Sequence, residues 1–150
     1  MRLVVTALIA ASFAFAAPNF SGNWKLNAPK SDFGQFPAPS SMTQTVTHEE
    51  PKLAVESKQS SDMGDFQISA KYTTDGKECV NQGFGGGQTK SVVKWDGDAL
   101  VIETKGTFGD NEFTMKDRWT LSADGKVLTI QRHIGSAMGE LDQKITLDKQ

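Results

Sequence analysis

Hydrophobic and polar residues alternate with a period of two along most of this chain. The segment 65–73 reads DFQISAKYT, in which every second residue is apolar, and the same alternation runs through 112–121 and 140–148. Successive side chains of a β-strand point to opposite faces, so the pattern predicts strands with one apolar and one solvated face. Beyond residue 16, no stretch of eleven or more residues shows the 3.6-residue apolar spacing of an amphipathic helix.

Turn signals separate these segments. Asp75-Gly76 and Asp124-Gly125 each lie between two alternating runs, where a tight hairpin turn needs the positive φ that Gly accepts. The predicted strands are 20–26, 41–48, 52–58, 65–73, 78–82, 89–95, 99–106, 112–121, 126–134 and 140–148. A long meander leaves exposed strand edges, and closing it into a barrel removes them. We therefore expect an all-β fold, a single antiparallel meander β-barrel of about 8–10 strands.

The first residues predict a signal peptide, residues 1–16. Arg2 gives a positive start, residues 3–15 are apolar apart from Thr6 and Ser12, and Ala14-Phe15-Ala16 has the small-x-small pattern of a cleavage site. The apolar run, about 13 residues, is shorter than the about 20 that a membrane span needs. Cleavage would leave 17–150 as one barrel domain, exported to the periplasm or secreted, with no stable membrane span. An uncleaved N-terminal anchor is the alternative.

Charge and cysteine content limit the binding partners and the disulfide bonds that we expect. The chain has 16 basic and 18 acidic residues, a net charge of −2, and the charges are interspersed. Nucleic acid is not an expected partner, because phosphate backbones are bound by clustered positive charge. Cys79 is the single cysteine, so no internal disulfide is possible. It is either a reactive thiol or a strand residue, and we favour the strand residue.

The segment 28–41 stands apart from the strands. It reads APKSDFGQFPAPSS, and its prolines cannot donate to a strand ladder, which predicts a loop. Phe33 and Phe36 should nevertheless be anchored. They either form a flap over one end of the barrel or cap the core from a plain crossover loop.

The first predicted strand contains Gly22-Asn23-Trp24. A Gly-x-Trp motif after a signal peptide, at the start of an all-β meander, resembles the first-strand motif of the lipocalins and their barrel relatives, and the whole pattern resembles bacterial lipocalin-like domain proteins. The resemblance implies that Gly22 lets the backbone approach closely and that Trp24 closes the barrel floor. It also implies an Arg from a late strand stacked on the indole as a cation–π partner.

Arg132 is the first candidate for that partner. It shares a predicted strand face with Leu128 and Ile130, so it should point inward, where an unpaired charge is costly. In one interpretation Arg132 packs on Trp24 and is structural, which we favour. In the other it binds a ligand carboxylate, as similar residues do in fatty-acid-binding barrels, although those usually carry Arg-x-Tyr. Arg118 is a competitor for the place beside Trp24.

The remaining candidates for chemistry are weak. Asp117 is the one acid that shares a face with the apolar residues of its strand, and we hypothesise that it forms an ion pair with Arg132 inside the barrel. His48 and His133 are too few for a zinc site. The glycine run 83–87 lacks the spacing of a phosphate loop and reads as a hairpin tip. We therefore predict no catalytic residue, no metal and no cofactor.

The leading hypothesis is an exported barrel that binds a small hydrophobic or amphipathic ligand in its interior. The predicted inward residues are mostly apolar, and a few polar anchors among apolar side chains are usual in ligand pockets. The candidate ligand-binding residues are Arg132, Asp117, Tyr72, Trp95, Phe66 and Met115. The alternative is a structural or interaction module with a filled core and no ligand. A third, weaker alternative is a barrel enzyme that uses Asp117, Arg132 or Tyr72.

Overall fold

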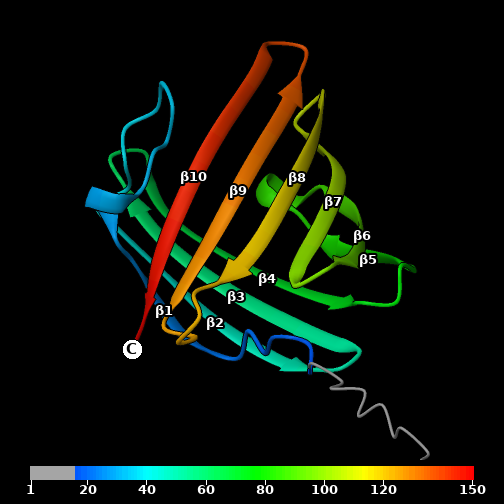
Figure 1. Cartoon of the computed structure of the whole chain (residues 1–150). Helices are drawn as coiled ribbons and strands as arrows, with labels where there is room; N and C mark the ends of the chain where they lie inside the picture. The colour runs from blue at the N-terminus through cyan, green and yellow to red at the C-terminus, as the bar shows by residue number, and fades with distance from the viewer. Residues whose placement is uncertain (1–15) are drawn as a thin grey trace, which may run out of the picture.

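The chain forms one antiparallel barrel. The computed structural model describes residues 16–150, so the predicted signal peptide lies outside the described residues except for Ala16. The strands in Figure 1 are β1 (Gly22–Leu26), β2 (Ser41–Glu49), β3 (Lys52–Ser61), β4 (Gly64–Thr73), β5 (Glu78–Gln82), β6 (Gln88–Asp96), β7 (Ala99–Phe108), β8 (Asn111–Leu121), β9 (Val127–Ser136) and β10 (Gly139–Lys149). The expected all-β meander is confirmed. In this described part, no helix is long and apolar enough to cross a membrane.

The strands follow a meander that closes through β1. The sheet order is β4-β3-β2-β1-β10-β9-β8-β7-β6-β5, and every neighbouring pair is antiparallel. The edge strands β4 and β5 meet across a seam without a backbone ladder in the described chain. The barrel is therefore nearly closed.

The first strand is shorter than predicted. The alternation predicted a strand from residue 20, but the ladder of β1 begins at Gly22. Phe20 leaves the ladder because its backbone N–H donates to Nδ1 of His48, at 3.2 Å. The Ser21 backbone N–H is bound by the Asn19 side chain instead, at 2.8 Å. The segment before β1 thus folds across one end of the barrel as a plug.

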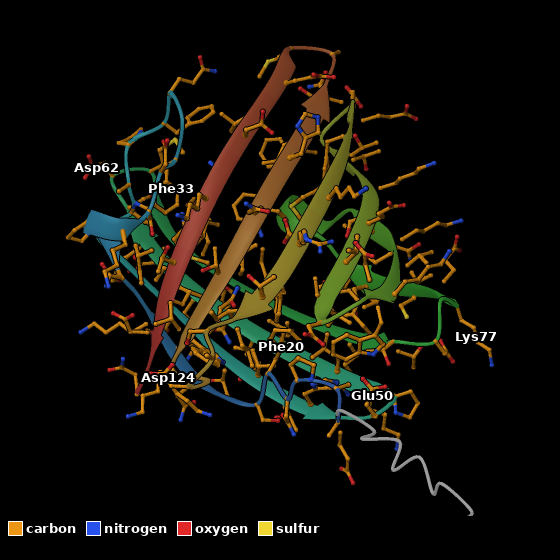
Figure 2. The ribbon with its side chains drawn as sticks, viewed as in Figure 1. Phe20, Phe33, Glu50, Asp62, Lys77 and Asp124 are labelled. Carbon is orange, nitrogen blue, oxygen red and sulfur yellow. The ribbon has the colours of Figure 1, made fainter. Side chains whose placement is uncertain are left out.

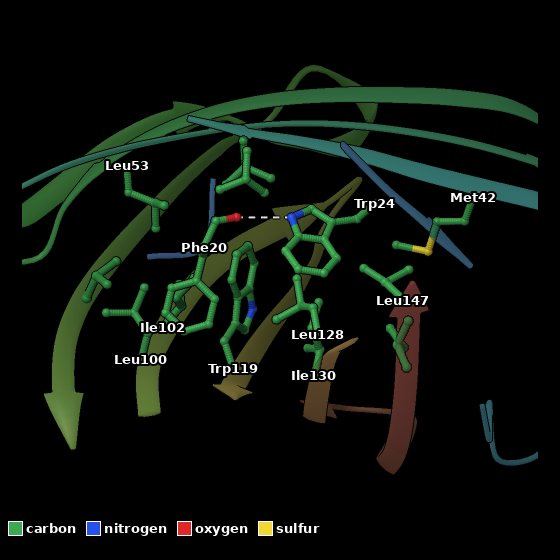
Figure 3. Close-up of a cluster of buried hydrophobic side chains, with 14 residues drawn as sticks. Phe20, Trp24, Met42, Leu53, Leu100, Ile102, Trp119, Leu128, Ile130 and Leu147 are labelled. Atoms are coloured by element: carbon green, nitrogen blue, oxygen red, sulfur yellow. Dashed lines mark hydrogen bonds between the residues drawn. The ribbon is translucent and has the colours of Figure 1, made fainter. Parts of the chain in front are cut away.

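The hairpin turns define two different ends. We call the end that holds Phe20, Glu50 and Asp124 the closed end, and the end that holds Asp62 and the segment 27–40 the open end (Figure 2). The closed end is filled by a cluster of side chains from all around the barrel (Figure 3). Its fully or almost fully buried members include Phe20, Trp24, Leu53, Val93, Leu100, Trp119, Leu128, Ile130, Ile145 and Leu147. Burial of this apolar surface is the main stabilising contribution to the fold.

The interior toward the open end is not filled in the same way. The strand register points Phe66, Phe113 and Met115 inward, but these residues are only half-buried. Ile68, on the same face of β4 as Phe66, is 39% exposed. The segment between β1 and β2 lies along this end, anchored by the pairing of Asp32 with Lys144 on β10. One half of the barrel is therefore a packed core, while the other has an accessible apolar lining.

Candidate functional site

A buried ion pair lies between β8 and β9. Asp117 and Arg132 are directly opposed in the ladder, and both side chains face the interior. Nε and Nη2 of Arg132 each donate to one carboxylate oxygen of Asp117, both at 2.8 Å. The Asp117 side chain is only 5% exposed and that of Arg132 21%. The hypothesised pair is thus present, in the bidentate geometry that gives the strongest side-chain hydrogen bonds.

The electrostatics of the pair hold Arg132 in its charged form. Desolvation by burial works to lower the pKa of the guanidinium, but the adjacent Asp117 carboxylate outweighs it, so the pKa of Arg132 lies above its ordinary value. Removing one partner would leave an uncompensated buried charge.

Tyr72 approaches the pair from β4, on the other side of the barrel. It packs against the edge of the core cluster. Burial, and then the negative charge of Asp117, raise the pKa of the phenol to about 12, with Arg132 opposing the shift. The hydroxyl therefore stays protonated and can donate. Two further hydroxyls, those of Ser91 and Thr104, are buried on β6 and β7 and bond to each other at 2.8 Å.

A cavity of about 370 Å³ opens beside Arg132 at the open end. Its walls come from the segment 33–40, the turn 61–63 and inward residues of four strands. Phe33, Phe36 and Met63 give it an apolar surface, and Met42 and Ile145 border it from the buried core cluster. The polar strand residues that line it are Gln59, Ser61, Arg132 and Gln143. The Gln143 side chain donates to the carbonyl of Phe33 at 3.4 Å, which ties the segment to the barrel wall.

The two phenylalanines of the segment 28–41 take different positions on this cavity. Phe33 is half-buried against the core cluster, whereas Phe36 is 49% exposed, and both line the cavity. The segment therefore forms a wall of the cavity rather than a plain crossover.

Trp24 lies at the closed end, but its cation–π partner is not the expected one. The indole is 1% exposed and donates from Nε1 to the carbonyl of Phe20 at 3.0 Å. Lys149 places its Nζ 5.5 Å from the ring centroid. Arg132 binds Asp117 instead, so the favoured packing of Arg132 on Trp24 was wrong. Arg118 was also a wrong candidate, because it pairs with Asp96 near the solvent.

Gly22 has a steric role beside this tryptophan. Its φ is +150°, a conformation that favours glycine, and an added Cβ would lie 2.8 Å from Cε of Lys149. The glycine thus leaves room for the lysine that covers Trp24.

Trp95 is separated from the other candidate ligand-binding residues by its place at the closed end. Its indole stacks on Phe20, with ring centroids 6.0 Å apart, and donates to Oε1 of Glu50 at 3.0 Å. The same carboxylate oxygen contacts Nε2 of His48 at 2.8 Å. Because Nδ1 of His48 accepts from Phe20, both ring nitrogens are engaged. This is a structural network that closes the barrel floor.

Phe66 and Met115 lie toward the open end, and their neighbours differ. Phe66 meets Phe84 of the glycine-rich tip, with ring centroids 4.5 Å apart, and Phe84 in turn stacks on Phe108 at 5.6 Å. This aromatic cluster joins β4, the tip and β7 across the seam. Met115 occupies the inward position next to Asp117 on β8, in the same row as Ile134.

Sequence reasoning missed the inward amides. Gln44, Gln59 and Gln143 interrupt apolar faces, and period-two parity marks all three as inward, but an isolated glutamine gives no motif. Gln44 is 5% exposed, and its Oε1 is buried without a hydrogen-bond partner, as is Nε1 of Trp119. Buried polar atoms are almost always satisfied. Among the described residues, no protein atom forms a hydrogen bond with either of these two atoms.

Comparison with known proteins identifies the fold. No family model and no curated protein matches the chain. Among solved structures, the zebrafish ileal bile acid-binding protein in complex with cholic acid is similar, with a TM-score of 0.59 and 16% identity over 87% of this chain and 98% of that one. A secretory abundant heat soluble protein of Ramazzottius varieornatus gives 0.59 and 12% over 87% and 94%. The REP1-NXSQ fatty acid transporter gives 0.57 and 13% over 87% and 98%.

These likenesses concern the fold alone. The chain shares the antiparallel β-barrel fold of these proteins, at identities that carry no residue role. The expected barrel resemblance is thus confirmed at the level of architecture.

Proposed function

We propose that this barrel is an exported protein that binds a small hydrophobic or amphipathic molecule in the cavity at its open end. The observation that carries the proposal is the cavity itself, which has a largely apolar wall and an arginine among a few inward polar groups. Its volume, about 370 Å³, lies within the range of about 300–1,000 Å³ for small-molecule sites. The unfilled apolar lining of the open half gives a ligand further surface to bury.

The structural neighbours support the class of ligand. One is described as a bile acid-binding protein and another as a fatty acid transporter, and both are matched over almost their whole length. The polar groups beside the cavity would orient the head of such a molecule, and the apolar wall would take its tail.

Binding is tested with the neutral dye N-phenyl-1-naphthylamine and by native mass spectrometry of the purified protein. We expect saturable binding of the dye at one site. Gln59→Trp, which fills the cavity, should weaken it by about tenfold or more, the loss that 1.4 kcal/mol gives. Gln67→Trp, on the outward face of β4, is the matched control and should leave it unchanged.

The same binding experiment tests the alternative of a filled barrel without a ligand. The packed closed end is the observation that supports this alternative. No bound molecule in the mass spectrum and no dye binding would together identify a structural or interaction module instead. Dye binding that Gln59→Trp leaves unchanged would show that the dye does not occupy this cavity.

Export is supported by the sequence of residues 1–16 and has its own test. Expressed in a bacterial host, the full chain should yield an extracytoplasmic form whose intact mass corresponds to loss of those residues. A full-length mass in the cytoplasm alone would contradict export.

A further inference from the structure

The cavity offers almost no net positive charge to a ligand. Among the described residues that line it, Arg132 is the one basic side chain and Asp62, at the mouth, is the one acidic side chain. Behind Arg132 lies Asp117, whose carboxylate is almost fully buried. The positive charge of Arg132, which would attract an anion, is therefore offset by two carboxylates, those of Asp117 and Asp62.

The hydrogen-bonding capacity of Arg132 is also partly used. The guanidinium gives one whole edge, Nε and Nη2, to Asp117. A ligand carboxylate that reached Arg132 would have to share the guanidinium with a second carboxylate. Two carboxylates in one poorly solvated site repel each other, so one of them would have to take up a proton or leave.

The other polar groups around the cavity suit an uncharged head group. Gln59 and Gln143 line the cavity and present amides, which both donate and accept. A ligand hydroxyl can both donate to and accept from these amides, whereas an ionised carboxylate can only accept.

We propose that the cavity selects amphipathic molecules with an uncharged, hydroxyl-bearing head group, and that Asp117 is the specificity-determining residue that excludes carboxylates. This inference rests on the proposed ligand-binding function and adds the class of ligand. Asp117 acts by occupying and neutralising Arg132, so replacing it with the uncharged, similarly shaped Asn should release the guanidinium for an anion.

The test compares dodecan-1-ol with dodecanoate as competitors for N-phenyl-1-naphthylamine at about pH 8. For the wild-type chain we expect the alcohol to bind more tightly than the acid by about tenfold or more, a difference of 1.4 kcal/mol per factor of ten. Asp117→Asn should tighten dodecanoate binding by a similar factor and thereby lower the preference for the alcohol over the acid. The matched control is Glu103→Gln, which removes one negative charge from the outer face of the neighbouring strand β7 and should change neither.

The outcomes separate this inference from the function on which it rests. A wild-type preference for dodecanoate would overturn the selectivity while leaving ligand binding intact, and this comparison needs no variant. An unchanged ratio in folded Asp117→Asn would overturn the role of Asp117. Absence of dye binding and of both competitors would overturn the proposed function itself.

Discussion

The Asn81 side chain on β5 joins the two edge strands of the barrel by pairing with the backbone of Lys71 on β4. Oδ1 accepts from the Lys71 amide at 2.8 Å, and Nδ2 donates to the Lys71 carbonyl at 3.0 Å. Two residues further along each strand, the Thr73 amide donates to Sγ of Cys79 at 3.3 Å. A side-chain amide carries the same donor and acceptor as a peptide group. Asn81 therefore takes the place of a ladder residue in a seam that lacks a ladder.

Asn81→Ala should loosen this seam. Loss of two hydrogen bonds, each with a net contribution of about 1 kcal/mol, predicts a lower free energy of unfolding by about 1–2 kcal/mol in urea titrations. Hydrogen exchange at the Lys71 amide should become faster. Gln82→Ala, at the exposed neighbouring position, should change the stability by less than about 0.5 kcal/mol. Unchanged protection of the Lys71 amide would refute the bridge.

The Asp117–Arg132 pair should show strong coupling in a double-mutant cycle. Asp117→Leu should lower the free energy of unfolding by about 3–5 kcal/mol, because it leaves the Arg132 charge buried and unpaired. The double variant Asp117→Leu/Arg132→Leu should be less destabilised than the sum of its single variants. The exposed pair Lys116–Glu103, at 3.5 Å, is the control and should couple by no more than about 1 kcal/mol. Additive effects at Asp117 and Arg132 would contradict the buried pair.

Tyr72 gives a pH prediction with a single reporter, since it is the only tyrosine in the chain. Ultraviolet difference absorbance should give a midpoint near the pKa of about 12 in the folded protein, against 10.0 for an ordinary phenol. Because the folded state holds this proton more tightly than the unfolded state, the associated stability is complete below pH 10 and is lost as the pH rises toward 12. A midpoint near 10 in protein that is still folded would show that the phenol is solvated.

Glu50 gives the opposite pH dependence. Burial works to raise the pKa of its carboxyl, but hydrogen bonds from Thr74, His48 and Trp95 prevail and lower it below 4.5. The folded state therefore binds this proton less tightly, so the associated stability is present above pH 4.5 and is lost as the pH falls through the lowered value. Urea unfolding between about pH 6 and pH 3 should show a shallower pH dependence for Glu50→Gln than for the wild type. Equal slopes would show that the network does not perturb Glu50.

Short-range regularities made much of the fold predictable. Asp-Gly turns and period-two alternation place neighbouring strands in register, so Asp117 and Arg132, on the two strands of one hairpin, could be matched by parity. A buried carboxylate at Asp117 needs a positively charged partner on the same inward face, and Arg132 has that parity on the adjacent strand. The ion pair is thus a local property of the β8–β9 hairpin.

Long-range closure was not predictable in the same way. Lys149 reaches Trp24 only because β10 pairs with β1, a contact between the two ends of the described chain that no hairpin signal specifies. Trp95 has inward parity as expected, but parity does not say at which height of the barrel a residue lies. In the structure it lies beside Phe20 at the closed end and does not line the cavity.

The packed core and the buried ion pair lie beside different chromophores of the chain. All three tryptophans, Trp24, Trp95 and Trp119, belong to or pack against the core cluster. The single tyrosine, Tyr72, packs against the same cluster but also feels the charges of Asp117 and Arg132. Indole emission should therefore follow the melting of the core, and the near-ultraviolet signal of Tyr72 should also respond to changes in the ion pair.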